Sequence, residues 1–368
     1  METKLVYKDR FEKNAYSLIE LGTPELLAAF ESGNSIVIKG LAEDEAVLCT
    51  DTKTFMVRQV NTSNSIILTE RDDLEAQHKV QDNLSHTIEL LPCLARTSRL
   101  DELLGHSCYS GEENEEAIKA SQTMYRLEDL LTVVQASKSE LLKGLDKRGA
   151  FVHEDYYRLF EKDYLLQLFD YLLTNSIING IDIKMITLGE AKQCIKEGSS
   201  EEKVDIPDDL LVSAINVFLT RVDHQDKEHE LIEFDRAKIC RFMGEWMLSN
   251  PRSKRWELED FTRLWSTMCH ELFTPELQDI DGLYLMYETI KLSNTVQYLQ
   301  YFPVSELSTD PPQRFAALFS EKPLWTLAEI QPFLVDLAPT KKEQEHLLLK
   351  FARSHRSKNT TSYGSRIK

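Results

Sequence analysis

Histidine and cysteine are the residues of this 368-residue chain with the widest chemical range, and four of them lie close together in the sequence. His86, Cys93, His106 and Cys108 have the composition of a Cys₂His₂ zinc site. Their spacing, H-x₆-C-x₁₂-H-x-C, matches no standard zinc finger. The remaining four of the six cysteines lie in apolar patterns typical of buried thiols. We therefore expect no bound metal and no cofactor.

Motifs for catalysis are incomplete or absent. Gly144 and Gly149 have the spacing of a phosphate-binding loop, but Ala150 stands where that loop needs lysine. HELIE at His229 and HELFT at His270 lack the second histidine of a single-helix zinc site. Neither a dinucleotide-binding glycine motif nor a hydrolase nucleophile motif occurs. The sequence therefore predicts a protein that is not an enzyme.

Two basic segments could contact nucleic acid. One is the turn PRSKR, and the other is the C-terminal segment KFARSHRSKNTTSYGSRIK. Arginine and lysine contacts to phosphate release counterions and give binding that depends on salt but not on base sequence. A solvated turn and a frayed terminus explain the same residues equally well, so both interpretations stay open. The candidate DNA-binding residues are Arg252, Lys254, Arg255, Lys350, Arg353, Arg356, Lys358 and Arg366.

The charge of the chain limits any such contact to local patches. The net charge is −18, and residues 341–368 hold eight Lys or Arg and two Glu, which leaves −24 on residues 1–340. An acidic body repels phosphate backbones. The chain is 42% hydrophobic, and no apolar run approaches the roughly 20 residues of a membrane span. We expect a soluble, intracellular protein.

Short strands dominate residues 16–68. SIVIKG, AVLCT, TFMVRQV and SIILTE are β-branched or alternating runs, and Asn61, Ser63 and Asn64 predict a turn between the last two. Four short strands seldom bury enough surface to be stable alone, and they leave open edges. We therefore expect a partner to complete the sheet. Residues 70–120 are polar and acidic, which predicts a loosely ordered spacer.

From residue 121 the pattern becomes helical. The predicted order is helix, helix, a hairpin around His153–Asp155, and helix, with capping boxes at Ser137–Glu140, Thr187–Glu190 and Thr326–Glu329. One helix is expected to end at SNPRSKR, and Pro332 is expected to kink its helix or to delay the start of that helix. Such units in tandem are typical of winged helices, although generic α+β packing explains the same periodicity.

The predicted fold class is α+β, with an N-terminal β-rich segment followed by three tandem winged-helix modules. The expected boundaries are 1–75 for the β-rich segment, 76–120 for the linker, 121–184, 185–255 and 256–352 for the three modules, and 353–368 for a basic tail.

Four blocks resemble one known family: residues 46–68, 234–250, 314–337 and 347–353. They are similar to the sister chromatid cohesion proteins of the Dcc family, a subunit of the alternative, cohesion-linked replication factor C clamp loader. The likeness extends along most of the chain and is weakest at 72–120. It implies a non-catalytic nuclear protein that acts in cohesion, DNA replication and the loading or unloading of the sliding clamp.

The resemblance also implies partners. The β-rich segment is expected to share a β-barrel with the large ATPase subunit and the small accessory subunit of the loader. The winged helices are expected to touch single- and double-stranded DNA without strong sequence preference and to dock on the catalytic subunit of polymerase epsilon. The replication factor C small subunits and, indirectly, the sliding clamp complete the expected assembly, with no membrane. The implied partner surface comprises Val47, Leu48, Phe55, Val57, Ile66 and Leu68, which are equally core positions of the same sheet.

Two other classes of function remain as alternatives. A stand-alone winged-helix DNA-binding regulator would use the same modules and basic tail, but would bind one sequence tightly. An enzyme with an unrecognised site would turn over nucleotide by itself.

Overall fold

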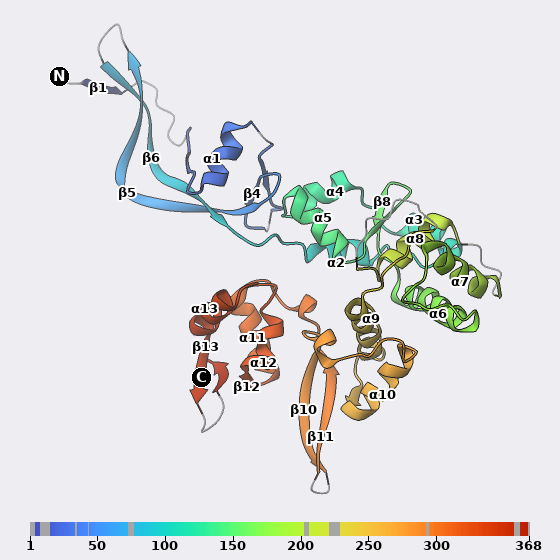
Figure 1. Ribbon diagram of the computed structural model, residues 1–368. Helices are drawn as coiled ribbons and strands as arrows, with labels where there is room; N and C mark the ends of the chain where they lie inside the picture. The colour runs from blue at the N-terminus through green and yellow to red at the C-terminus, as the bar shows by residue number, and fades with distance from the viewer. Residues whose placement is uncertain are drawn as a thin grey trace. The chain divides into compact units, whose positions relative to one another are not determined.

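The computed structural model describes residues 4–7, 15–33, 35–42, 44–72, 77–201, 206–220, 229–291, 294–356 and 361–366 (Figure 1). The chain divides into two compact units. The first comprises Met1–Leu104, Met124–Lys147 and Asp155–Tyr157, and the second comprises Gly105–Thr123, Arg148–Glu154 and Arg158–Lys368. Each unit has a hydrophobic core of its own. The predicted α+β class is confirmed, since helices and several sheets are both present.

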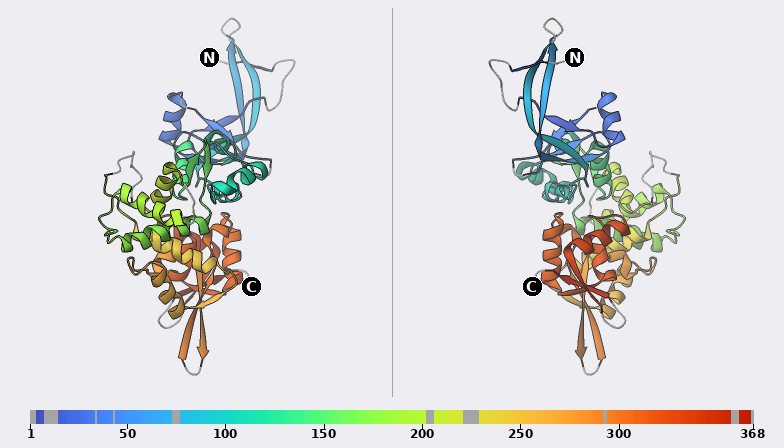
Figure 2. Two further views of the ribbon diagram at one scale, coloured as in Figure 1. Left: turned by 90° about the vertical axis from the view of Figure 1, so that its right-hand side faces the viewer. Right: turned by 90° about the vertical axis from the view of Figure 1, so that its left-hand side faces the viewer.

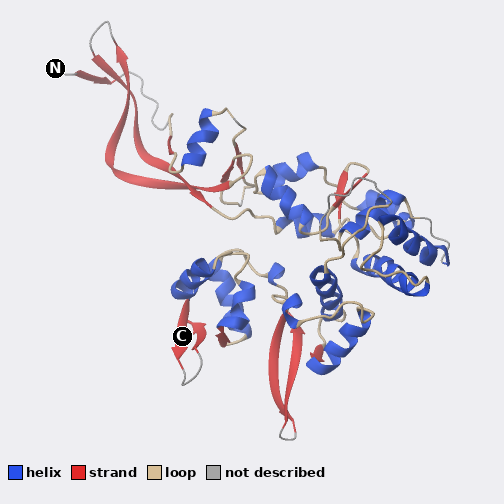
Figure 3. Cartoon of the chain, in the orientation of Figure 1, coloured by secondary structure: helices blue, strands red, loops and turns tan. Residues whose placement is uncertain are grey.

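One sheet dominates the first unit, and two long strands form its centre (Figure 3). Strand β5, Thr54–Asp72, runs antiparallel to β6, Gln77–Pro92, from the pair Phe55–Pro92 to the pair Asp72–Gln77. The sheet order is β1-β6-β5-β4-β3, and β2 also pairs with β6. The short strands are β1 (Lys4–Tyr7), β2 (Leu18–Glu20), β3 (Val37–Lys39) and β4 (Val47–Cys49). Within the described residues this sheet does not close into a barrel.

The core of the first unit lies where helix α1, Pro24–Glu31, packs on one end of the sheet. Thr23 begins the helix, because its side-chain oxygen accepts a hydrogen bond from the Leu26 amide at 3.3 Å. Pro24 takes the first helical position, where its missing N–H is not needed. The fully buried side chains of this cluster are Leu26, Leu48, Phe55 and Leu90.

Two expectations for this part of the chain are wrong. The turn expected at residues 61–64 is absent, because β5 is one strand whose register shifts between Asn61 and Ile66. Residues 76–120 are not a loosely ordered spacer, since they contain β6, helix α2 (Arg99–Gly105) and helix α3 (Glu112–Ser121). The acidic run begins α3, and carboxylates in the first turn of a helix are stabilising.

The predicted order helix, helix, hairpin, helix is confirmed from residue 127. Helices α4 (Leu127–Val133) and α5 (Lys138–Asp146) precede strands β7 (Phe151–His153) and β8 (Tyr156–Arg158). The capping box of Ser137 and Glu140 is present, with the Glu140 amide 3.2 Å from Ser137 Oγ. Glu154 and Asp155 have φ of 48° and 68°, the backbone that a two-residue hairpin turn needs.

The second unit repeats one order of elements three times: a helix, a short strand or β-bridge, two helices and two antiparallel segments. In the first copy these are α6 (Lys162–Ile178), Thr187, α7 (Leu188–Glu201), α8 (Asp208–Asn216), Leu219 and Leu231–Phe234. In the second they are α9 (Arg236–Ser249), β9 (Arg255–Glu257), α10 (Leu258–Met268), the 3₁₀ helix η1 (Leu277–Ile280), β10 (Tyr284–Lys291) and β11 (Asn294–Tyr301). The third has α11 (Pro311–Glu321), β12 (Leu324–Thr326), α12 (Leu327–Ile330) continued by η3 (Gln331–Phe333), α13 (Lys341–Phe351), β13 (Ala352–Arg356) and β14 (Thr361–Ser365).

The two later copies share a sheet topology. The strand order is β10-β11-β9 in one and β12-β14-β13 in the other. In both sheets the last strand of the copy, β11 or β14, lies in the centre. The order of elements also occurs once earlier, in α3, Tyr125, α4, α5, β7 and β8, with Tyr125 bridged to Tyr157. Four copies therefore begin near residues 112, 162, 236 and 311. The expected boundaries at 121, 185 and 256 fall inside these copies, because α3 was assigned to the linker and α6 and α9 to the preceding modules. Helix α11 was not separated from the third expected module.

Buried tryptophans anchor the last two copies. Trp265 lies in the larger core of the second unit and donates from Nε1 to the Cys240 carbonyl at 2.8 Å. Trp325 lies in the core of the last copy and donates to the Lys322 carbonyl at 2.7 Å. A buried indole N–H without an acceptor would be costly, so these bonds keep the large rings in place. Of the two effects predicted for Pro332, a delayed start does not occur, since α12 begins at Leu327 directly after its Thr326 cap. The helix instead changes to a 3₁₀ turn at Gln331–Phe333.

Candidate partner and nucleic-acid surfaces

The long hairpin of the first unit has an open edge. Strand β4 pairs with only Thr54–Met56 of β5, and no described strand lies along the same edge from Arg58 to Leu68. On the other side of the hairpin, β1 pairs with Gln77–Val80 of β6 and β2 with Thr87–Glu89. No described strand pairs with that edge between them, at Asn83–His86. The middle of the hairpin is therefore only two strands wide.

The backbone at this open edge has a defined direction. The Cys93 amide bonds to the Thr54 carbonyl at 3.1 Å, and antiparallel pairing alternates, so Arg58 and Val60 also direct their amides toward β6. The Val57 amide points the other way and bonds to the Ala46 carbonyl at 3.2 Å. The Gln59 amide points the same way as that of Val57, where β4 has ended. Such groups pair readily with a further strand.

The residues predicted to face partners divide into two groups. Val47, Leu48 and Phe55 are at most 2% exposed and lie in the core, so in this structure they are not contact surface. Val57 is half-buried against the same core. Ile66 is half-buried and Leu68 is 38% exposed, both on the part of β5 beyond β4. Whether these six contact a partner stays a prediction.

Other apolar side chains around the sheet are more exposed than those predicted. They lie on the edge strands β1, β2 and β3 and in the adjoining segments, and include Leu5, Tyr7, Tyr16, Leu18, Val37 and Ile38. Sequence reasoning missed them because it took the partner surface only from the block 46–68, and these residues lie outside that block. Their position on edge strands, where one face and one edge meet solvent, is the signal that could have found them.

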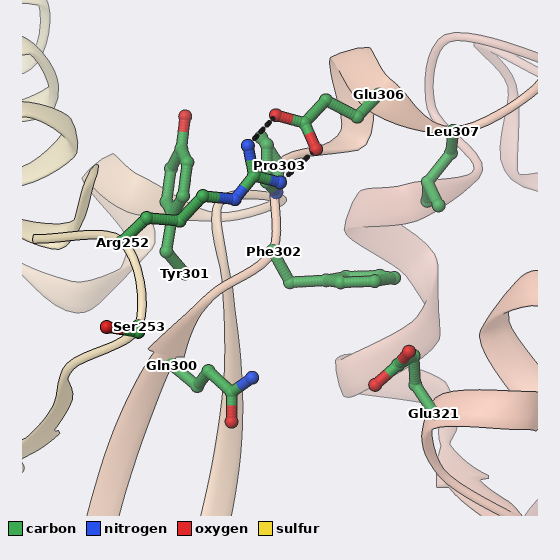
Figure 4. Close-up of a pocket in the computed structure, with 9 residues that line it drawn as sticks. All are labelled: Arg252, Ser253, Gln300, Tyr301, Phe302, Pro303, Glu306, Leu307 and Glu321. Atoms are coloured by element: carbon green, nitrogen blue, oxygen red, sulfur yellow. Dashed lines mark hydrogen bonds and ion pairs between the residues drawn. The ribbon is translucent and has the colours of Figure 1, made fainter.

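The basic turn lies beside a surface cavity of about 650 Å³ in the second unit (Figure 4). Arg252 forms a two-point ion pair with Glu306, with Nη1 at 2.7 Å, and its guanidinium lies 5.5 Å from the centre of the Tyr301 ring. This hydrogen bonding to Glu306 raises the pKa of Arg252. Phe302 extends into the cavity toward Leu307 and Glu321.

The other two cations of the turn also have partners within the chain. Arg255 donates from Nε to Gln300 at 2.9 Å and lies over Tyr287, 5.0 Å from the ring centre. The Lys254 ammonium lies 3.1 Å from the centre of the Trp256 ring. With Glu306 and Glu321 on its walls, the cavity carries two carboxylates against one guanidinium. The three cations of this turn therefore contact residues of their own copy, and the contact of the turn with DNA stays a prediction.

The C-terminal basic segment is an ordered hairpin. Arg353, His355 and Arg356 lie exposed on β13, and Lys350 lies exposed in the last turn of α13. Among the described residues, Lys350, Arg353 and Arg356 form no ion pair. Lys358 lies outside the described residues.

Arg366 differs from the other basic residues of this segment. Its guanidinium donates to the carbonyls of Ala352 at 3.1 Å and Lys350 at 3.0 Å. A cation at a helix C-terminus stabilises the last carbonyls, so Arg366 holds the end of α13. It still contributes positive charge to the same face.

Helix α13 adds candidates that sequence reasoning missed. Lys341, Lys342 and His346 are exposed on this helix, and Leu349 is 73% exposed. Thr340 caps the helix, with the Glu343 amide 3.3 Å from its hydroxyl. These residues could have been predicted from the sequence, because α13 is the last helix before the basic hairpin. Helix α13 also exposes Glu343 and Glu345, so its basic residues alternate with carboxylates, and phosphate binding by helix and hairpin stays a prediction.

Groups for metal binding are not assembled in the described part of the chain. No group of three or more histidine, cysteine, aspartate or glutamate side chains there could hold a metal ion, and His86, Cys93, His106 and Cys108 are no exception. Burial raises the pKa of Cys93 to about 11, which makes its thiol unreactive. His270 instead joins two copies by bonding Nε2 to Asp170 Oδ1 at 2.9 Å. No described helix is long and apolar enough to cross a membrane.

Comparison with known proteins identifies the family. The family model described as Sister chromatid cohesion protein Dcc1 matches residues 16–334. This chain belongs to that family. It is 28% identical over 365 residues to the mouse sister chromatid cohesion protein, covering 95% of this chain and 87% of the relative. The Xenopus laevis protein is 28% identical over 376 residues, which cover 98% of this chain and 92% of the relative.

The yeast relative shows that the likeness persists over a wide range of organisms. The Saccharomyces cerevisiae sister chromatid cohesion protein is 24% identical over 376 residues, covering 96% of this chain and 97% of the relative. These relatives are named as cohesion proteins and not as enzymes. The predicted family is therefore confirmed, and a role in sister chromatid cohesion is supported.

Proposed function

We propose that this chain is a non-catalytic adaptor subunit of the alternative, cohesion-linked replication clamp loader. It links the loader to polymerase epsilon and to DNA in the nucleus, while other subunits hydrolyse ATP. The observation that carries the proposal is the open edge of β5 from Arg58 to Leu68.

The open edge needs a binding partner for physical reasons. A two-stranded ribbon is marginally stable in water, and its free amides and carbonyls pair with whatever strand is presented. Here the ribbon also carries half-buried Ile66 and exposed Leu68. Strands from the large ATPase subunit and the small accessory subunit would extend the sheet along β5 and fill the gap beside β6, giving the shared β-barrel. The free amides and the free carbonyls of the ribbon would then all have hydrogen-bond partners.

The second unit supplies the contacts with DNA and polymerase in this proposal. The repeated order of helix, strand, two helices and hairpin is that of a winged helix, so we assign three such modules to this unit and a fourth to the earlier copy that begins near residue 112. In winged helices the last helix and the hairpin approach nucleic acid. The last copy suits that role because α13 and β13 carry unpaired cations, whereas the rest of the chain is acidic.

Co-purification from cells that express the loader subunits together tests the adaptor role. The double variant Ile66→Asp, Leu68→Asp places charge on the open ribbon without touching the fully buried core. We expect it to lose the large ATPase subunit and the small accessory subunit. The matched control is Leu349→Asp, which changes an apolar side chain of greater exposure on α13 and should retain both partners.

Retention of both subunits by the double variant would contradict the proposal, provided that circular dichroism shows an unchanged fold. The alternative function, a stand-alone DNA-binding regulator, makes a different prediction about DNA. It requires the purified chain alone to prefer one duplex sequence by more than about a thousandfold. Competition between unrelated duplexes measures that preference directly.

A further inference from the structure

The hairpin β10–β11 of the second unit has an edge along which no described strand pairs. Its strands pair without interruption from Tyr284–Tyr301 to Lys291–Asn294, and in both views of Figure 2 they extend beyond the neighbouring helices. Strand β9 covers only Tyr298–Gln300 of β11. Strand β10 is the edge strand of this sheet. The outer half of the hairpin is therefore a ribbon with two free edges.

The free backbone groups of β10 follow from the hydrogen-bond register. The Phe302 amide bonds to the Leu283 carbonyl at 2.8 Å, so Leu283 and every second residue after it bond toward β11. The residues between them, Met286, Glu288 and Ile290, direct both amide and carbonyl away from β11. No described backbone group bonds to these amides. They form a row of donors and acceptors spaced for a further strand.

The charge of this hairpin argues against nucleic acid. Residues 284–291 and 294–301 contain two charged residues, Glu288 and Lys291. The side chain of Glu288 accepts a hydrogen bond from Gln297 at 2.9 Å. The equivalent hairpin of the last copy carries Arg353 and Arg356 instead. Phosphate binding needs several cations, and Lys291 at the end of β10 is the only one on these two strands. A protein strand needs backbone groups and matching side chains, which it has.

The side chains along the same edge define what fits. Ile290 is 78% exposed, Glu288 is exposed, and Met286 is half-buried nearer the core. Natural edge strands usually carry lysine, proline or a bulge that prevents pairing. None of these interrupts Leu285–Ile290. An incoming strand would place apolar residues beside Met286 and Ile290 and a basic residue beside Glu288.

We propose that β10 is a docking edge that takes an extended segment of a partner protein as a fourth strand of this sheet. The segment is weakly charged and rich in β-branched residues, with one basic residue opposite Glu288. This edge lies in the second unit, so it goes beyond the proposed function, which uses the edge of β5 in the first. The two surfaces serve different partners or different parts of one partner.

Residue-resolved amide hydrogen exchange on the full chain tests the proposal. The probe is the peptide acetyl-Thr-Val-Lys-Ile-Thr-Val-amide, and the same peptide with proline in place of isoleucine is its control. The probe should slow exchange of the Met286, Glu288 and Ile290 amides about tenfold or more. The Tyr287 and Thr289 amides, already bonded to β11, should not change. The proline peptide should have no effect.

A pair of variants separates edge pairing from unspecific binding. Ile290 and Thr295 lie opposite each other, on the edge strand and the inner strand. Ile290→Lys should abolish the slowing, because a charge on an edge strand opposes pairing, and Thr295→Lys should keep it. Slow exchange of Leu299, a core residue of β11, shows that each variant is folded.

Three results would overturn the proposal. One is no slowing at the three outward amides, or equal slowing in both lysine variants. The second is slowing that rises with the concentration of the chain without peptide, which would mean pairing of two copies. The third is slowing by a DNA duplex, which would assign the edge to nucleic acid.

Discussion

Removing the unpaired cations of the last copy should change how DNA binding responds to salt. The variant is Lys350→Ala, Arg353→Ala and Arg356→Ala in the full chain. All three side chains are exposed, and none forms an ion pair among the described residues. Lys350 lies 5.1 Å from the centre of the Phe351 ring, but no carboxylate neutralises any of the three side chains in the described residues. They are therefore available to phosphates, and removing them should leave the core of this copy intact, since none of its buried side chains changes.

The size of the effect follows from counterion release. Each phosphate neutralised contributes about 0.9 to the slope of log affinity against log salt on duplex DNA. Three lost contacts should therefore make the slope less steep by about 2.7. Between about 50 and 200 mM salt, wild type should lose about fortyfold more affinity than the variant does, since 4 raised to 2.7 is about 40.

Fluorescence anisotropy with a labelled duplex of mixed sequence measures both slopes. The matched control removes the same number of cations from the turn, as Arg252→Ala, Lys254→Ala and Arg255→Ala. Glu306 already neutralises Arg252, and Lys254 and Arg255 lie over aromatic rings. We expect the control to change the slope by less than about 1. Equal changes in the two variants, or an unchanged slope in the first, would refute the reasoning.

Three further substitutions test the packing of the second unit and are measured by urea or thermal unfolding followed through tryptophan fluorescence. Glu115→Ala should lower the free energy of unfolding by about 3–5 kcal/mol, because the fully buried Arg158 guanidinium, which bonds to Glu115 at 2.8 and 2.9 Å, would lose its carboxylate. A decrease of less than about 1 kcal/mol would contradict this. Gly244→Ala should lower the free energy of unfolding by about 1–3 kcal/mol, because the added methyl would lie 2.6 Å from Ile280 Cγ2. An unchanged unfolding midpoint would refute this prediction. Hydrogen bonds from two lysines of α7 lower the pKa of Asp208, so its stabilising contribution is present above its ordinary pKa of 3.8 and is lost as pH falls through the folded-state pKa. The small difference in melting temperature between wild type and Asp208→Asn should therefore shrink from about pH 6 to about pH 3, and a growing difference would reverse the assigned sign.

Local patterns in the sequence predicted those elements whose signals are local. The hairpin at 151–158 was found because its turn residues separate two apolar runs, and the capping boxes were found because they need only four residues. The end of α9 before Pro251 and the break at Pro332 follow from the backbone of proline. These features depend little on the rest of the molecule.

Strand β6 was missed although its pattern is present. Val80, Leu84, Ile88 and Leu90 alternate with the period of a strand, but polar residues occupy two positions of the same series. One is Asp82, which is fully buried and accepts a hydrogen bond from the Tyr16 amide at 3.1 Å. A polar residue that is buried because a distant segment bonds to it cannot be recognised from its neighbours. Tertiary context decided this element.

The fourfold repeat also had a signal that was not used. Leu127, Leu188, Leu258 and Leu327 each begin the second helix of a copy. A carboxylate follows two residues later each time, and in three copies it accepts from the backbone amide before that leucine at 2.8 Å. The spacing between copies varies with loop length, which hides the repeat from inspection. The candidate DNA-binding residues were predicted from charge alone, and charge does not show which cations are already paired.

Hydrogen exchange at the open edge of β5 tests the central claim most directly. The amides of Gln59 and Val57 point away from β6, while those of Arg58 and Val60 point toward it. In the free chain the Gln59 amide should exchange rapidly, and in the complex with the large ATPase subunit and the small accessory subunit it should exchange at least about a hundredfold more slowly. Rapid exchange of Gln59 in the complex, or full protection in the free monomer, would contradict the account.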